Sequence, residues 1–202
     1  MALDKQKLYD GLIKAFDKGI ETSPVSNGED GETESRYTKS DIAGFIADAI
    51  VDYASEAEIL LLPGPLIIPA PTPVPDLANL GSILKIQTAD IAKPALKASI
   101  EASLVSKDPV MGLITTGIMA YIPASFTLFK SITGNIATGV TLPTIPPVLA
   151  PCTALGMVGS EEDKIVELMA IIIHATFKSS VFNGAGASVV GGFGPVIFQP
   201  LL

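Results

Sequence analysis

Apolar residues recur every three or four positions in several stretches of the chain, a period typical of amphipathic helices. The first stretch runs from Asp4 to Lys18 and is closed by Gly19. The second follows Ser40, which we expect to cap its N-terminus, and it places apolar side chains up to Tyr53 on one face. Both stretches are predicted to be helices that pack on a core through one side.

Three further helices are predicted downstream. One begins with Pro94, because proline is favoured at the first helical position. The next opens at residues 108–109 and ends before Pro123, which lacks the amide hydrogen that a helix interior requires. The last is capped by Ser160, carries acidic residues in its first turn and ends at Asn183–Gly184. About five helices together with short strands predict an α+β fold, in a single domain that spans residues 1–202.

Three stretches contain almost no charge and are interrupted by proline or glycine: residues 59–75, 126–151 and 181–202. We call them the apolar arms. Proline cannot donate the amide hydrogen that a central strand needs, and it breaks helices. The arms are therefore predicted to be extended chain with short β-strands.

The apolar arms hold more uncharged surface than a monomer usually exposes, whereas permanent subunit interfaces are apolar in this way. We therefore expect the arms to lie against neighbouring subunits. A glycine-rich, β-prone terminal segment such as residues 189–202 could add a strand to a neighbour's sheet. The candidate interface residues are Leu61, Leu66, Ile67, Ile68, Leu142, Ile145, Val148, Val189, Val190, Phe193, Val196, Ile197 and Phe198.

Charge is concentrated near the N-terminus. Residues 1–58 carry 13 acidic and 6 basic side chains, and the rest of the chain carries 8 and 7. Residues 23–37 are polar, acidic and glycine-containing, which predicts a solvated loop. The formal net charge of −8 argues against binding nucleic acid, which proteins attract with basic surfaces.

Residues that could carry chemistry are few. His174 is the only histidine and lies in an apolar helix, which favours a core or interface role over a metal ligand. Cys152 is the only cysteine, so neither an intramolecular disulfide nor a cysteine zinc site can form. The glycines after residue 183 follow a helix and miss the spacing of a nucleotide-binding loop. We therefore expect no catalytic residue, metal or cofactor, and no enzymatic activity.

Residues 109–129 form a nearly uncharged window that raises the question of a membrane span. Pro123 should end a helix that begins at Pro109, and that helix would be only about 21 Å long against a bilayer core of roughly 30 Å. We therefore expect no membrane span. The alternative that stays open is a small membrane-inserted protein, such as a pore or a holin-like factor, that uses this window.

One arrangement recurs along the sequence. The windows GLIKAF (11–16), DAIVDY (48–53), TGIMAY (116–121) and IIHATF (172–177) each end in an aromatic residue. The last three are followed within a few residues by an apolar arm. This pattern suggests a repeated unit of a helix and an arm, although many core helices share the same spacing.

Two segments carry a resemblance to a known class of protein. DIAGFIADAIVDYASEAEILLLPGPLIIPAPTPVP and EDKIVELMAIIIHATFKSSVFNGAGASVVGGFGPV resemble small structural proteins of contractile-tailed bacteriophages. The resemblance implies a virion subunit of the tail, baseplate or neck, without enzymatic activity and present in symmetric copies. Its partners would be copies of itself and other virion structural proteins, and it would be assembled in the host cytoplasm. A cellular scaffold subunit would share these features.

Overall fold

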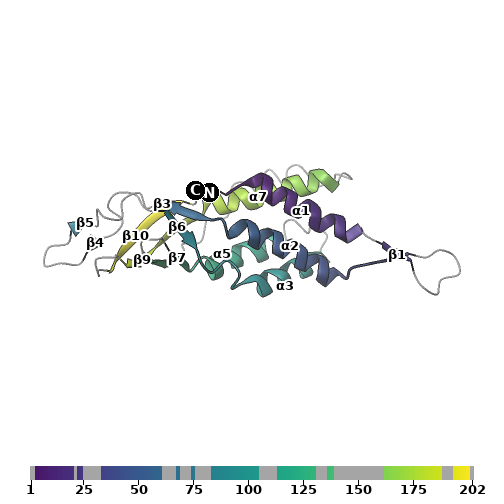
Figure 1. Ribbon diagram of the computed structural model, residues 1–202, viewed down its shortest axis with the longest axis horizontal. Coiled ribbons are helices and arrows are strands. Elements are labelled where there is room, and N and C mark those ends of the chain that lie inside the picture. The colour runs from purple at the N-terminus through teal and green to yellow at the C-terminus, as the bar shows by residue number, and fades with distance from the viewer. Residues whose placement is uncertain are drawn as a thin grey trace.

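The computed structural model describes residues 3–20, 22–24, 33–60, 67–68, 74–75, 83–104, 113–130, 136–138, 162–187 and 193–200. These residues form an elongated molecule with a helical bundle in the middle (Figure 1). A β-sheet lies at one end of the bundle, and a short hairpin lies at the other end. The α+β class predicted from the sequence is confirmed at this level, with helices predominating.

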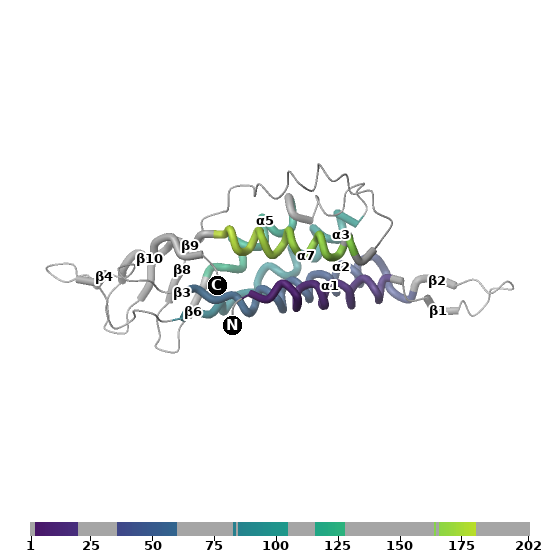
Figure 2. Tube along the Cα trace, turned by 90° about the horizontal axis from the view of Figure 1, so that it is seen from above, coloured from purple at the N-terminus to yellow at the C-terminus, as the bar shows by residue number. Residues whose placement is uncertain are grey.

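Within the described ranges the bundle contains five α-helices and one π-helix. α1 and α7 run side by side along it (Figure 2). α1 packs between α2 and α7, and α3 packs between α2 and the π-helix η2, which also contacts α7. Leucine, isoleucine and aromatic side chains fill the space between them, among them Leu8, Leu12 and Ile50, which are fully buried. The helices are α1 (Lys5–Ile20), α2 (Lys39–Ala54), α3 (Lys93–Ser103), η2 (Leu113–Ile118), α5 (Met119–Ser125) and α7 (Glu162–Ser179).

The sheet is an antiparallel meander of six strands. Its order is β3-β6-β7-β8-β9-β10, so among these six strands each one pairs with the strand before it and the strand after it in the sequence. The edge strands β3 and β10 also contact each other without pairing, so the sheet is strongly curved. The strands are β3 (Glu58–Leu60), β6 (Ile83–Ile86), β7 (Leu128–Lys130), β8 (Ile136–Thr138), β9 (Val181–Ala187) and β10 (Phe193–Pro200).

Two hairpins extend the molecule at its opposite ends. β1 (Thr22–Pro24) pairs with β2 (Thr33–Ser35) at the end away from the sheet, and β4 (Ile67–Ile68) pairs with β5 (Val74–Pro75) beyond the sheet (Figure 1). β2 and all of β1 except Thr22 lie inside the segment predicted to be a loop, residues 23–37. The described parts of that segment therefore include paired strands.

A helix followed by a two-stranded hairpin occurs four times. α1 precedes β1 and β2, α2 precedes β3 and β6, α5 precedes β7 and β8, and α7 precedes β9 and β10. The aromatic residues that end the four windows lie in these four helices, although the window 116–121 begins in η2. The sequence of elements agrees with the predicted succession of helix and arm, while common ancestry of the four units stays a prediction.

The sequence predicted these helices, but it placed several of their ends at the wrong residues. α2 is capped by Thr38 and not by Ser40: the Thr38 hydroxyl accepts from the Asp41 amide, and the Asp41 carboxylate accepts from the Thr38 amide at 2.9 Å. This capping box satisfies two amides that would otherwise be unpaired. α3 begins at Lys93, with Pro94 in its first turn, close to the predicted start.

The two remaining helices extend differently from the prediction. α5 continues through Pro123 to Ser125, because Tyr121, Ile122 and Phe126 are buried in the core and hold this turn in place. α7 ends at Ser179, before Asn183–Gly184, which lie in β9. The hydroxyls of Ser179 and Ser180 both donate to the Thr176 carbonyl, so this carbonyl of the last helical turn has hydrogen-bond donors. Asp108, Pro109 and Ser160 lie outside the described residues.

Residues 113–125, from the window considered for a membrane span, form η2 and α5 and pack on α3. Ile118, Tyr121 and Ile122 of this segment are buried. Among the described helices, none is both long and apolar enough to cross a bilayer.

Candidate functional site

Four aromatic side chains meet where the bundle joins the sheet. Tyr53, Tyr121, Phe126 and Phe177 are each at most 1% exposed. The ring of Phe177 lies 5.4 Å from that of Tyr53 and 5.4 Å from that of Phe126, in tilted or edge-to-face geometry. Such contacts stabilise a core beyond the burial of apolar area alone. Three of the four recurring windows therefore end in side chains that meet at one point.

Each tyrosine hydroxyl in this cluster has a hydrogen-bond partner. Tyr121 donates to the Ala89 carbonyl, and the Tyr53 hydroxyl lies 2.6 Å from Nδ1 of His174. Burial raises the pKa of both tyrosines above the ordinary value, so both stay protonated. Burial, followed by the charges of Lys178 and Lys5, lowers the pKa of His174. One hydrogen bond therefore joins the neutral Tyr53 hydroxyl and neutral His174, and the tautomer of the imidazole sets which of the two donates.

This arrangement is suited to packing and not to catalysis. A histidine acting as a general base needs a nucleophile with an accessible proton, and Tyr53 is fully buried with a raised pKa. Among the described residues, no group of three or more histidine, cysteine, aspartate or glutamate side chains could hold a metal ion. Cys152 lies outside the described residues.

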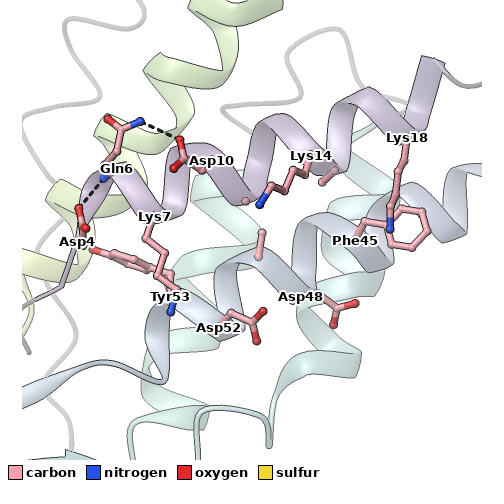
Figure 3. A pocket seen from close by; sticks show the side chains of 13 residues that line it. Asp4, Gln6, Lys7, Asp10, Lys14, Lys18, Phe45, Asp48, Asp52 and Tyr53 are labelled. Carbon is pink, nitrogen blue, oxygen red and sulfur yellow. Dashed lines mark hydrogen bonds between the residues drawn. The ribbon is translucent and has the colours of Figure 1, made fainter.

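A groove of about 650 Å³ runs between α1 and α2 (Figure 3). The two helices run antiparallel and approach closely at Gly11, where an added Cβ would lie 3.1 Å from Cβ of Ala49. Lysines from α1 line one side, and Asp48 and Asp52 from α2 line the other. The groove is thus shallow over small residues and lined by charges of opposite sign.

Several of the charges around this groove are paired within the chain. Lys7 forms an ion pair with Glu56, and Lys93 of α3 pairs with Asp48, which is the main cause of the raised pKa of Lys93. The ammonium of Lys18 lies 4.1 Å from the ring centroid of Phe45, in cation–π geometry. These contacts tie α1, α2 and α3 together at the surface.

The structure brings together two of the predicted interface segments. Ile67 and Ile68 form β4, while Phe193, Val196, Ile197 and Phe198 lie in β10, and the backbones of these strands contact each other. The remaining predicted interface residues lie outside the described part of the chain: Leu61, Leu66, Leu142, Ile145, Val148, Val189 and Val190.

Sequence reasoning did not single out the α1–α2 groove. The signal was present as the spacing of Lys7, Lys14 and Lys18, which share one side of a helix. What was missing was the knowledge that α2 lies beside them with its acidic residues, because that pairing depends on tertiary structure.

No protein-family model matches the chain, and comparison with curated proteins and with solved structures finds no significant match.

Proposed function

We propose that this protein is a structural subunit that assembles with copies of itself and with other proteins through its β-sheet end. The resemblance of its helix-and-arm segments to small proteins of contractile-tailed bacteriophages supports a virion tail, baseplate or neck as the assembly. The apolar arms interlock adjacent subunits in this proposal, and no chemical step is involved.

The uneven charge of the sheet carries the proposal. β8, β9 and β10 contain no charged residue, whereas Glu58, Lys85 and Lys130 lie in the other three strands. β10 is an edge strand of eight residues that contacts β3 and β4, but no strand of the described chain forms a ladder with its outer side. Monomeric proteins usually place charges on exposed edge strands because an uncharged edge recruits other strands. An uncharged edge therefore fits a subunit whose sheet end meets another polypeptide.

The elongated shape supports the same function. The core of the helical bundle is buried within one chain, together with Ile59 and Ile86 of the sheet. The β1–β2 and β4–β5 hairpins lie at opposite ends of the molecule (Figure 1). Two unlike ends on one body can form head-to-tail contacts, which generate rings or filaments.

Lysine substitutions in β10 test the proposal. Val196→Lys and Phe198→Lys together place charge on the edge strand, so we expect the purified variant to sediment as small species while the parent chain forms large ones. The matched control places Glu167→Lys and Ile171→Lys on the exposed side of α7, away from both ends of the molecule. Helical circular dichroism should be the same in all three proteins. Large assemblies of the β10 variant, equal to those of the parent, would contradict the proposal.

A further inference from the structure

Charged residues form four parallel stripes on the surface made by α1, α2 and α3. Helical periodicity places Asp10 and Asp17 of α1 further from α2 than the lysines of α1, although Asp10 also lines the groove. Lys93 contacts Asp48, and Lys97 lies beside Gly44, so the lysines of α3 flank the acidic side of α2. In order across the surface the stripes are Asp10 and Asp17; Lys7, Lys14 and Lys18; Asp41, Asp48 and Asp52; and Lys93 and Lys97.

The signs of these stripes alternate, and the order makes the surface complementary to itself. A two-fold axis that runs along the groove, parallel to the helices, would place α1 of one copy over α2 of the other. The lysine stripe of each copy would then face the aspartate stripe of its partner, and the outer acidic stripe would face the lysines of α3. Complementary charge of this kind orients partners and excludes wrong ones.

The heights of the residues along the helices agree with this arrangement. Gly11 lies level with Ala49 and Gly19 lies level with Ile42, as the close approaches at these glycines show. Lys14 is therefore within about one helical turn of Asp48 in height. A two-fold axis parallel to the helices preserves height, so Lys14 of one copy comes opposite Asp48 of the other.

We propose that the α1–α2–α3 surface binds a second copy of this chain as a parallel, two-fold dimer. The side chains of Lys14 and Asp52 have no ion pair or hydrogen bond among the described residues, so both have charge to offer a partner, while Asp48 would share its carboxylate between Lys93 of its own chain and Lys14 of the other copy. In a parallel dimer the β-sheet ends of both copies lie on the same side. The dimer uses a surface other than the apolar arms and stands independently of the proposed function.

The size of the surface suits a weak dimer. α1 and α2 have 16 residues each, about 24 Å at 1.5 Å per residue, and three helices side by side are roughly 25 Å wide. Each copy would contribute about 600 Å², near the lower limit for a specific interface. An interface of this size made largely of ion pairs should dissociate as salt is raised.

Charge reversal with mixing tests the dimer directly. The test uses the full-length chain with Val196→Lys and Phe198→Lys, in which assembly through β10 is blocked, as its parent. Sedimentation equilibrium of this parent should show a dimer at about 50 mM salt, with a dissociation constant at least tenfold higher at about 500 mM salt. Lys14→Asp alone and Asp48→Lys alone should each be monomeric at low salt, because each places like charges opposite each other. An equimolar mixture of the two variants should form a heterodimer, because both contacts then join opposite charges.

Glu167→Lys on α7 is the matched control, because it reverses an exposed charge outside this surface and should leave the dimer unchanged. A parent chain that is monomeric at low salt overturns the proposal. Single variants that dimerise as strongly as the parent also overturn it. A mixture that stays monomeric, while both variants keep the circular dichroism of the parent, overturns it as well. The proposed function is tested apart from the dimer by placing Lys14→Asp in the chain with an unaltered β10. If that chain still forms large assemblies, the proposed function stands even where the dimer fails.

Discussion

The hydroxyl of Tyr53, at the end of α2, lies 2.6 Å from Nδ1 of His174 on α7, residues that are 121 positions apart in the sequence. The bond joins two helices at the point where the bundle meets the sheet. It also explains the only histidine of the chain as part of a packed aromatic cluster.

Removing either side of this bond should destabilise the protein to different extents. Tyr53→Phe loses one hydrogen bond and should lower the free energy of unfolding by about 1 kcal/mol. His174→Ala leaves the buried Tyr53 hydroxyl without its partner and should cost about 1–3 kcal/mol. Urea unfolding of both single variants and the double variant measures the coupling. Additive effects in the double variant would show that the two groups do not interact.

The same histidine should make stability depend on pH. Its pKa in the folded protein is below the ordinary value of 6.5, mainly because of burial. The unfolded chain therefore takes up a proton first as the pH falls below about 6.5, so stability should be complete above this pH and should be lost as the pH falls through the folded pKa. Urea unfolding between pH 7.5 and about 5 should show a smaller loss in His174→Gln than in the parent. Equal losses would contradict the assignment.

Two glycines should respond to substitution in opposite directions. Gly11→Val forces a branched side chain into the α1–α2 contact, where even a Cβ would lie 3.1 Å from Ala49, and should cost about 1–3 kcal/mol. Gly44→Ala adds a methyl group at ordinary contact distance from Lys97 and removes a flexible residue from α2, so it should stabilise by about 0.5–1 kcal/mol. Thermal unfolding of both variants checks the helix packing. A stabilising Gly11→Val would mean that the helices are further apart.

The cap of α2 gives a test of structure against sequence. Thr38→Ala removes the side chain that accepts from the Asp41 amide and should cost about 1 kcal/mol. Ser40→Ala, at the position expected from the sequence, should change stability by less than about 0.5 kcal/mol. Equal losses in the two variants would show that the capping box does not form in solution.

Helix periodicity could be read from the sequence, but several of the helix ends could not. The stripes of α1 and α2 are local, whereas Pro123 stays within α5 because Tyr121 and Ile122 are buried against other helices. Asn183 and Gly184 looked like a helix end, yet Gly184 lies in β9 opposite Val196 of β10. Pairing between distant segments decided these cases, and no local pattern encodes it.

The candidate surfaces were predictable to different degrees. The apolar arms stood out because charge is absent over long stretches. The described parts of the arms pair with one another and with β6, an arrangement that composition could not predict. The striped surface depends on α1, α2 and α3 lying side by side, so its complementarity becomes visible only in the folded chain.

The central claim is that the uncharged sheet end joins this protein to other polypeptides, and removal of β10 tests it most directly. A chain ending at Gly192 keeps β9 paired with β8 and lacks the edge strand, and Ala185→Lys in the same chain places a charge on β9, which becomes the new edge. Sedimentation velocity should show large symmetric assemblies for the full chain, and only monomers or dimers with unchanged helical circular dichroism for the shortened chain. A full-length chain that sediments as a monomer or a dimer at high concentration, or a shortened chain that assembles equally well, would contradict the account.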